Sequence, residues 1–300
     1  MDDFLKYIKA VGTGPRHNRD LSKDEAFDAM SQILNGKVSH EVIGAFLLGW
    51  RVKSETGEEF MGAVEAFDDF TKKCEIPNSI ELGYPYDGKN DNPYLFTLVA
   101  SYLEKFEINL VLCGDDLNHA KGGITVKEVC ESVQLGENIF CFNRGEVFPA
   151  LSRLNSIREN LQIRTSLNSI EKLTGFASSE VGILGAFHKP FVDKYIQIYR
   201  NRYRKFAVIK GNEGSLEIFG KCKLWICDGE KIEEITIDPE EFGVSYKKSW
   251  EKITLEESLE MLANPSKELL KLAKLNAAVM LYIYSDSFES IKESFEAIML

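Results

Sequence analysis

The sequence has no apolar run of about 18 residues or more, the length that a membrane-spanning helix needs. Its first residues, Met1 to Phe4, are acidic, and the basic stretch and apolar stretch of a secretory leader are missing there. We therefore expect neither a membrane span nor a signal peptide. The resulting prediction is a cytoplasmic protein.

Cysteine is absent from the arrangements that bind zinc or build disulfide frameworks. The six cysteines include no Cys-x-x-Cys pair and no Cys/His spacing of a zinc site. Some lie in apolar runs, as Cys113 does after residues 110–112, where a thiol behaves as a small hydrophobic side chain. We expect reduced thiols and no disulfide framework.

Positive charge is in deficit. The 36 lysines and arginines face 47 aspartates and glutamates, which gives a formal net charge of −11 and a pI near 5.1. Such a chain repels polyanions on average, although the average can hide a local basic patch. Of its 300 residues, 44% are hydrophobic, and no internal repeat stands out. One large domain, alone or with a smaller companion, is predicted.

The first 75 residues carry the signals of short amphipathic helices. Capping boxes of the form Ser/Thr-x-x-Glu occur at Ser22 and at Thr56, and Ser39 is expected to cap a helix between them. Apolar residues at helical spacing follow each of these positions. The sequence predicts a small helical domain over residues 1–75.

Residues 76–300 alternate between short apolar runs and longer helical patterns. Strands are expected at residues 80–82, 109–113, 139–142, 181–187 and 206–209. Helices are expected at residues 94–106, 125–133, 149–160, 190–203 and 267–284. A small β meander is expected at residues 216–219, 223–227 and 233–237. The alternation favours an α/β domain over residues 76–300 with a mostly parallel central sheet flanked by helices.

Motifs in a fixed order along the chain resemble glycosyltransferase family 3, which includes the anthranilate phosphoribosyltransferases. The helical motifs are residues 20–26 (DLSKDEA), 44–48 (GAFLL) and 51–56 (RVKSET). The later motifs are residues 163–168 (IRTSLN), 185–188 (GAFH) and 276–278 (NAA). The resemblance implies a nucleoside phosphorylase/phosphoribosyltransferase-like fold and a homodimer built through the helical domain.

The same resemblance places a diphosphate-binding loop at residues 83–88 (GYPYDG). The family's Gly-Thr-Gly-Gly-Asp-Gly loop cradles a diphosphate with backbone N–H groups. Three positions keep the family's residues and are expected to bind substrate: Gly83, Asp87 and Gly88. Pro85 and Tyr86 replace small residues, and proline has no N–H to donate. An altered diphosphate site is therefore implied.

Other positions of the family's site are kept in part. Lys121 matches a lysine that holds phosphate, although it would also suit a solvated loop. Arg164 matches an arginine that contacts anthranilate, and the alternative is a surface salt bridge to Glu171. The family's hydroxyl cluster falls near residues 93–96 (PYLF), where leucine and phenylalanine cannot donate to a phosphate. Residues 112–115 replace the family's Lys-His-Gly-Asn by Leu-Cys-Gly-Asp.

The family's magnesium-holding Asp-Glu pair corresponds to Leu216 and Glu217. Magnesium prefers oxygen ligands and bridges carboxylates and substrate phosphates, so the loss of one carboxylate implies weakened Mg²⁺ binding. Glu217 is the metal-ligand candidate, with a purely structural role as the alternative. His188 precedes an expected helix, and we interpret it as an N-terminal cap rather than a catalytic group.

A basic segment supports a second interpretation. Five of its cations are candidate nucleic-acid contacts: Lys194, Arg200, Arg202, Arg204 and Lys205. Three tyrosines at helical spacing, Tyr195, Tyr199 and Tyr203, would offer stacking surfaces beside them. The alternative is a helix whose tyrosines pack inward and whose cations stabilise its end.

Two hypotheses about function remain. The first is a phosphoribosyltransferase-like protein with pentosyl transfer weakened, changed or lost at an altered diphosphate site. The second is a non-catalytic nucleic-acid-binding protein, because the eroded loop and residues 16–22 (RHNRDLS) also resemble the divergent YbiB-type branch. No catalytic residue is expected, since displacement at ribose C1 requires positioning and charge stabilisation rather than a protein nucleophile. A different phosphorylated or nucleoside-like ligand is a third interpretation.

Overall fold

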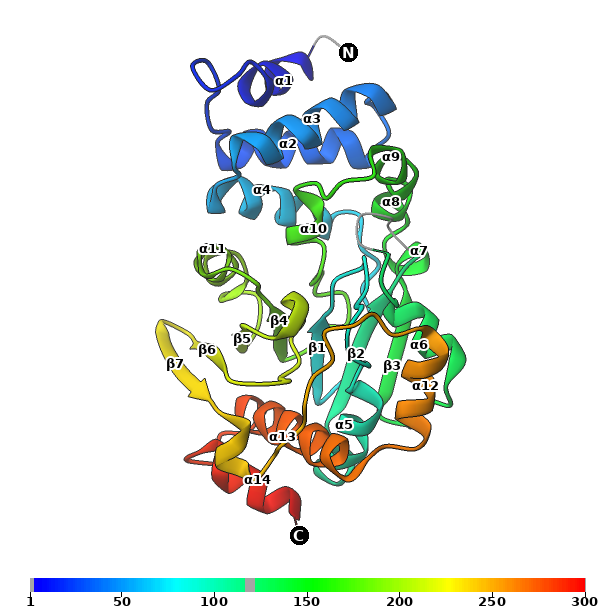
Figure 1. The fold of residues 1–300 in the computed structure, drawn as a ribbon. Coiled ribbons are helices and arrows are strands. Elements are labelled where there is room, and N and C mark those ends of the chain that lie inside the picture. Colours follow the sequence, from blue (N-terminus) through cyan, green and yellow to red (C-terminus); the bar gives the residue numbers. More distant parts are fainter. Residues whose placement is uncertain (1–2, 117–121, 300) are drawn as a thin grey trace.

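The computed structural model of the protein describes residues 3–116 and 122–299. A helical part lies above an α/β part (Figure 1). The helical part begins with helices α1 (Leu5–Gly12), α2 (Lys23–Leu34), α3 (His40–Lys53) and α4 (Gly57–Asp68). Two helices from later in the chain, α8 (Pro149–Ser152) and α9 (Asn155–Leu161), join it, and α9 packs against α3. The helical layer thus draws on two separate segments.

The predicted capping boxes are confirmed. The side chains of Ser22 and Thr56 accept hydrogen bonds from backbone N–H groups three residues on, and the glutamates at those positions bond back. These bonds satisfy N–H groups that a helix start leaves without intrahelical partners. Ser39 occupies the N-cap position of α3 but makes no capping bond through its side chain.

The central sheet has seven strands in the order β3-β2-β1-β4-β5-β6-β7. The parallel strands are β1 (Ser79–Gly83), β2 (Asn109–Gly114), β3 (Ile139–Asn143), β4 (Val181–Gly185) and β5 (Lys205–Ile209). An antiparallel hairpin of β6 (Cys222–Asp228) and β7 (Lys231–Ile237) extends one edge. The predicted α/β class with a mostly parallel sheet is confirmed.

Side chains of successive strand residues alternate between two hydrophobic cores, one on each face of the sheet. In β2, Val111 belongs to one core while Leu110 and Leu112 belong to the other. The Val111 core also receives the helical part, α7 (Arg144–Val147), α10 (Leu167–Ile170) and α11 (Lys189–Tyr199). The opposite core receives α5 (Phe96–Leu103), α6 (Val126–Ser132), α12 (Leu255–Ala263), α13 (Lys267–Tyr284) and α14 (Ile291–Met299). Short 3₁₀ turns lie at Glu104–Phe106, Asn212–Gly214 and Pro239–Phe242.

One predicted strand is wrong. Residues 216–219 are buried but form no strand, whereas the other two strands of the expected meander are confirmed as the antiparallel pair β6 and β7, which extends the main sheet. The side chain of Asn276 on α13 explains this difference. It accepts a hydrogen bond from Ile218 N (2.8 Å) and donates one to Ile218 O (3.0 Å). A side-chain amide thus satisfies backbone groups that a neighbouring strand would otherwise pair.

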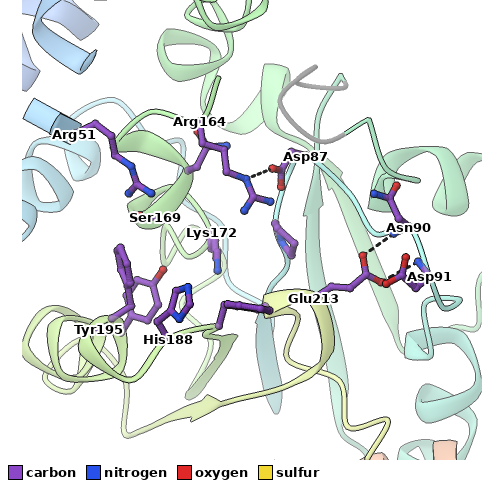
Figure 2. Close-up of a pocket in the computed structure, with 15 residues that line it drawn as sticks. Arg51, Asp87, Asn90, Asp91, Arg164, Ser169, Lys172, His188, Tyr195 and Glu213 are labelled. Carbon is purple, nitrogen blue, oxygen red and sulfur yellow. Dashed lines mark hydrogen bonds and ion pairs between the residues drawn. The ribbon is translucent and has the colours of Figure 1, made fainter. Parts of the chain in front are cut away.

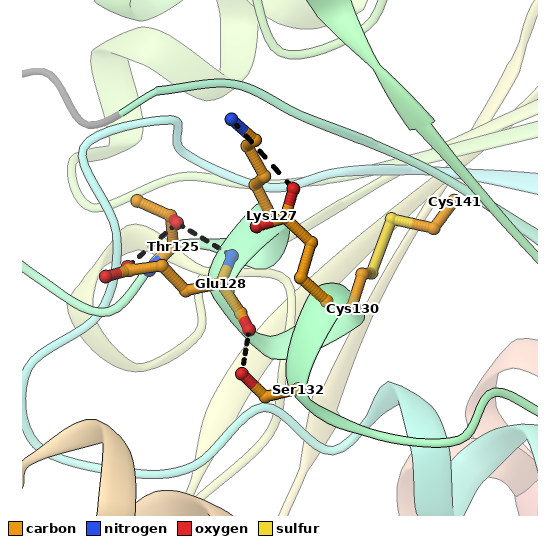
Figure 3. Close-up of a disulfide and its surroundings, with 7 residues drawn as sticks. Thr125, Lys127, Glu128, Cys130, Ser132 and Cys141 are labelled. Carbon is orange, nitrogen blue, oxygen red and sulfur yellow. Dashed lines mark hydrogen bonds and ion pairs between the residues drawn. A yellow bond between two sulfur atoms is a disulfide. The ribbon is translucent and has the colours of Figure 1, made fainter.

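The prediction of reduced thiols throughout is also wrong. Cys130 on α6 and Cys141 on β3 form a disulfide (Figure 3), with their Cα atoms 6.6 Å apart. The two cysteines meet because α6 packs against β3. The other four cysteines are free thiols.

Helices α2 and α4 approach each other so closely that Gly62 has no room for a side chain. A Cβ atom there would lie 2.1 Å from Lys23 O and 3.0 Å from Phe27 N, both backbone atoms. We expect Gly62→Ala to lower the free energy of unfolding by about 1–3 kcal/mol, because the helices must separate. Gly220→Ala is the control, since its Cβ would meet no atom within 4 Å. Urea unfolding of both variants checks the difference, and equal stabilities would contradict the close packing.

Candidate functional site

The strand order places a crevice at one edge of the sheet. The chain builds outward from β1 through β2 to β3, and then in the other direction through β4 to β5. The loops after β1 and β4 therefore diverge, and ligands of open α/β sheets bind at such switch points. A cavity of about 510 Å³ lies there (Figure 2). Its walls include Pro85 and Asp87 after β1, and Phe187 and His188 after β4.

Three cationic side chains line this cavity. Arg51 comes from α3 of the helical part, whereas Arg164 and Lys172 flank α10. All three reach toward the same open space in Figure 2. Lys172 also donates to Gly185 O at the end of β4 (2.9 Å). The cations are thus held by different parts of the fold and converge on one space.

Aromatic side chains form another part of the cavity wall. Phe187, Phe191 and Tyr195 line the cavity, and the His188 ring lies edge-on to Phe187 at 4.7 Å. Burial raises the pKa of Tyr195, so its hydroxyl is neutral at physiological pH. Cations and aromatic side chains in one cavity are complementary to a flat ligand that carries negative charge.

Carboxylates occupy the opposite rim. Asp87 is buried and accepts a hydrogen bond from Arg164 Nε at 2.6 Å. Glu213 accepts from the backbone N–H groups of Asn90 (2.8 Å) and Asp91 (3.0 Å). The prediction that Asp87 and Arg164 belong to one site is consistent with this arrangement. The alternative of an Arg164–Glu171 salt bridge is wrong, because Glu171 pairs with other arginines.

The loop after β1 is packed tightly against protein. A Cβ atom at Gly83 would lie 2.9 Å from the side chains of Leu173 and Leu184. Gly88 has a φ of +80°, and a Cβ there would lie 2.5 Å from the backbone of Gly123. Both glycines therefore serve close packing, and neither lines the cavity. Lys121, the other expected phosphate ligand, lies outside the described residues.

Aromatic side chains fill the interior beside this loop. Tyr84, Tyr94 and Phe96 are buried and form a cluster in which the Tyr84 and Tyr94 rings are 5.1 Å apart. Burial raises the pKa of both tyrosines. Two loop N–H groups already have internal acceptors, since Tyr84 N donates to Leu82 O (3.0 Å) and Gly88 N to Pro85 O (3.2 Å).

Glu217 lies under the same loop with its carboxylate enclosed by protein donors. Its Oε1 accepts from the Tyr84 hydroxyl (2.9 Å) and from Leu95 N (2.5 Å). Its Oε2 forms a buried ion pair with the Lys89 ammonium group. The sequence left open whether Glu217 binds a metal ion or has a structural role. These contacts match the structural role.

A buried charge network supports the loop from its other side. Arg144 donates to Asp115 (2.5 Å) and to Glu171 (2.7 Å), and Arg158 holds Glu171 with two bonds of 2.6 Å. The Arg144 guanidinium also lies over the Tyr86 ring at 4.2 Å. Asp115, which stands where the family's motif has asparagine, is thus paired with Arg144.

The electrostatics of this network favour charged carboxylates. Burial opposes ionisation of Glu171, but the charges and hydrogen bonds of Arg158 and Arg144 outweigh it and lower the pKa. Burial likewise opposes ionisation of Asp115, and Arg144 and Ser152 reverse the effect so that its pKa is also lowered. Both groups stay ionised near neutral pH.

The predicted nucleic-acid face has a different surrounding. Tyr195, Tyr199 and Tyr203 are buried. The expectation that they form stacking surfaces is therefore wrong, and the alternative that they pack inward is right. The five cations have protein partners: Lys194 with Glu55 O, Arg200 with Glu230, Arg202 with Asp68, and Arg204 and Lys205 with Asp286. Nucleic-acid binding stays a prediction.

Several cavity residues escaped sequence reasoning. Arg51 belongs to a motif of the resemblance but carried no predicted role, and Lys172 had no signal at all. His188 stands at the N-cap position of α11 as predicted, but its side chain makes no capping bond and lines the cavity. These residues come from elements far apart in the chain, so only tertiary packing reveals them.

Because Glu171 pairs with two buried arginines, Glu171→Gln should lower the free energy of unfolding at pH 7 by about 3–5 kcal/mol. The Glu171 carboxyl group has a lowered pKa in the folded state, so it stabilises the fold at pH values above its pKa in the unfolded chain. This stabilisation is lost as the pH falls through the folded-state pKa. The difference in free energy of unfolding between the wild type and Glu171→Gln should therefore shrink below about pH 4. Urea unfolding across pH measures it. Glu230→Gln, at an exposed pair, should cost about 1 kcal/mol or less.

Family models cover most of the chain. The helical bundle domain of the glycosyl transferase family matches residues 5–71, and the a/b domain of that family matches residues 118–299. The chain is 28% identical to an uncharacterized protein of Aquifex aeolicus, with 98% of this chain and 97% of that one covered. It is 27% identical to the anthranilate phosphoribosyltransferase of the same organism, with coverage of 92% and 88%.

The fold is similar to that of a solved relative. The anthranilate phosphoribosyltransferase from Saccharomyces cerevisiae in complex with PRPP and Mg superimposes with a TM-score of 0.78 at 16% identity. The match covers 99% of this chain and 92% of the yeast chain. None of the described helices is long and apolar enough to cross a membrane. The chain belongs to the glycosyl transferase family defined by these helical bundle and a/b domains, and within it resembles the anthranilate phosphoribosyltransferases (TrpD).

Proposed function

We propose that the protein binds a small anionic aromatic ligand in the cleft between its two parts, and that phosphoribosyl transfer from a diphosphate donor is weakened, changed or lost. The supporting observation is that the two sides of the cleft differ. The side of the cleft around Arg164 is open and cationic, whereas the loop that the resemblance assigns to diphosphate is packed with its own side chains.

The open side suits an aromatic carboxylate. Arg51, Arg164 and Lys172 supply cations, and Phe191 and Tyr195 supply a flat apolar wall. Arg164 is half exposed, with 48% of its side chain accessible, so a ligand can reach it without unfolding the site. A guanidinium group holds a carboxylate with two parallel hydrogen bonds, which fixes its orientation.

The donor side suits a diphosphate poorly. Pro85 has no N–H, and the N–H groups of Tyr84 and Gly88 already bond within the protein. The carboxylate of Glu213 also lines the cavity, and its negative charge opposes a polyanion. Displacement at ribose C1 depends on stabilising the leaving diphosphate, so these changes act on the chemical step itself.

The residues present do not fit the family's magnesium ion. The yeast relative was solved with PRPP and Mg, but here Leu216 stands where the resemblance places one carboxylate. The remaining carboxylate, Glu217, is enclosed by protein donors. We propose that Mg²⁺ binds more weakly here than in that relative.

Calorimetric titration tests the proposal. We expect anthranilate or benzoate to bind, and PRPP with Mg²⁺ to bind only at about millimolar concentrations or not at all. Arg164→Gln should weaken carboxylate binding about 10- to 100-fold, the effect of losing a charged hydrogen bond. Arg16→Gln, at an exposed position that does not line the cavity, is the matched control and should change nothing.

Two outcomes would contradict the proposal. Micromolar binding of PRPP with Mg²⁺, accompanied by product formation, would restore the family's reaction. Salt-sensitive binding of a single-stranded oligonucleotide, lost when Arg200 and Arg204 are both changed to alanine, would favour the nucleic-acid hypothesis.

We also propose a homodimer formed through the helical part. Apolar side chains are exposed on neighbouring helices α1 and α3, namely Leu5 (41%), Leu48 (37%) and Val52 (74%). Burying such side chains against a second copy would stabilise the dimer. Val52→Asp should shift the sedimentation coefficient toward the monomer. Ile232→Asp on edge strand β7 should leave it unchanged, and a monomeric wild type would refute the dimer.

A further inference from the structure

We propose that Lys89 is a built-in cation that takes the place of a divalent metal ion at Glu217, so that the cleft works without a metal. The idea deepens the proposed function and rests on it, because the cleft is taken as the ligand site. Lys89 is a positioning residue in this proposal, since it is fully buried and does not line the cavity.

The contacts of Glu217 leave no oxygen directed at an outside ligand. Both side chains of the pair are buried, with accessibilities of 0% for Lys89 and 1% for Glu217. One carboxylate oxygen pairs with the Lys89 ammonium, and the other accepts from the Tyr84 hydroxyl and Leu95 N. A metal ion would have to displace these donors before it could coordinate the carboxylate.

The space around Lys89 is built for an ammonium group. Its Nζ donates to Pro93 O at 2.8 Å and lies 4.9 Å from the Tyr94 ring and 4.7 Å from the Phe219 ring. Aromatic faces attract an ammonium ion. Mg²⁺ instead requires an octahedron of oxygen ligands, which these rings do not supply. The two rings therefore favour the ammonium group, whereas the Pro93 carbonyl and the Glu217 carboxylate are oxygen ligands that a metal ion could use once the lysine is removed.

A metal could reach Glu217 only by separating the buried pair. The lysine would then remain charged in the interior without its carboxylate, an arrangement that proteins avoid because of its desolvation cost. The covalently attached cation thus excludes a diffusible one. Its charge is also single and fixed, whereas Mg²⁺ brings two charges and bridges carboxylate to diphosphate.

The pair also connects the cleft wall to the sheet. Lys89 pairs through its backbone with Ile124, with N–O distances of 2.9 and 2.7 Å, and precedes the cavity residues Asn90 and Asp91. Glu217 follows β5 on the far side of the switch point. The ion pair therefore fixes the cleft-forming loop relative to β5, a role that a bound metal and its substrate would otherwise fill.

The test is whether removing the lysine creates a metal site. Mn²⁺, followed by electron paramagnetic resonance in the absence of any organic ligand, is the probe. We expect no Mn²⁺ binding through Glu217 in the wild-type protein. Lys89→Met should bind Mn²⁺ at least about tenfold more tightly than any residual binding by the wild-type protein, because the substitution frees the Glu217 carboxylate. The double variant Lys89→Met/Glu217→Gln should lose this gain.

Controls separate this role from a general structural one. Lys223→Met removes an exposed lysine that pairs with Glu234, and it should leave Mn²⁺ binding at the wild-type level. Circular dichroism establishes that each variant is folded. If Lys89→Met proves too unstable to purify, Lys89→Gln takes its place, since its neutral amide also removes the cation. If the role of Lys89 were only structural, its replacement would change the stability of the protein without creating a cation site that depends on Glu217.

Two results would overturn the proposal. One is Mn²⁺ binding by the wild-type protein that Glu217→Gln abolishes. The other is a folded Lys89 variant that gains no Mn²⁺ affinity. Neither measurement contains an aromatic ligand, so both can fail while anthranilate or benzoate still binds. Conversely, failure of those ligands to bind would refute the proposed function and leave the Mn²⁺ result standing.

Discussion

The interior of this protein depends on burying charged groups only together with partners. An isolated ion in a low-dielectric interior is strongly destabilising, whereas a paired and hydrogen-bonded one is tolerated. Glu217 has Lys89, and Glu171 has Arg144 and Arg158. These networks lie on either side of the loop after β1 and hold it in place. Charge pairing, together with apolar packing, thus holds the loop that forms one wall of the cleft.

The buried carboxyl group of Glu81 shows how the pKa changes when no cation lies at hydrogen-bonding distance. Glu81 on β1 accepts bonds from Thr174 N (3.0 Å), Gly175 N (3.1 Å) and the Tyr203 hydroxyl (2.9 Å). Burial outweighs these bonds and raises its pKa, the opposite of the direction for Glu171. The comparison explains why arginine and lysine, rather than neutral donors, stand beside the carboxylates under the cleft loop.

The fold of the family is therefore preserved, while several positions that the resemblance assigns to the substrate site have partners within the protein. A shared fold establishes the scaffold and the place of the cleft, but chemistry depends on the side chains that line it. Here Tyr84, Tyr94 and Phe96 fill space with apolar surface and a lysine occupies the carboxylate. The charged contacts of this region are made within the chain, where they stabilise the fold.

Local signals in the sequence determined much of the architecture. The capping boxes at Ser22 and Thr56 depend on bonds within one turn of helix, and helix α13 matches its predicted bounds of residues 267–284. Alternating strands and helices indicated the parallel sheet, and the ordered motifs indicated the family. Of the residues that line the cavity, the sequence supplied Asp87 and Arg164 as candidates, because each stands in a motif that survives in part.

What surrounds those candidates was decided only by tertiary structure. Lys89 meets Glu217 across more than a hundred residues of chain, and Arg51 reaches the cavity from the helical part. Asn276 replaces a strand partner for Ile218, and Cys130 faces Cys141 because a helix packs on a strand. Local patterns reflect interactions between near neighbours in the chain. The partners of a buried charge are set by packing between distant segments, which no short motif records.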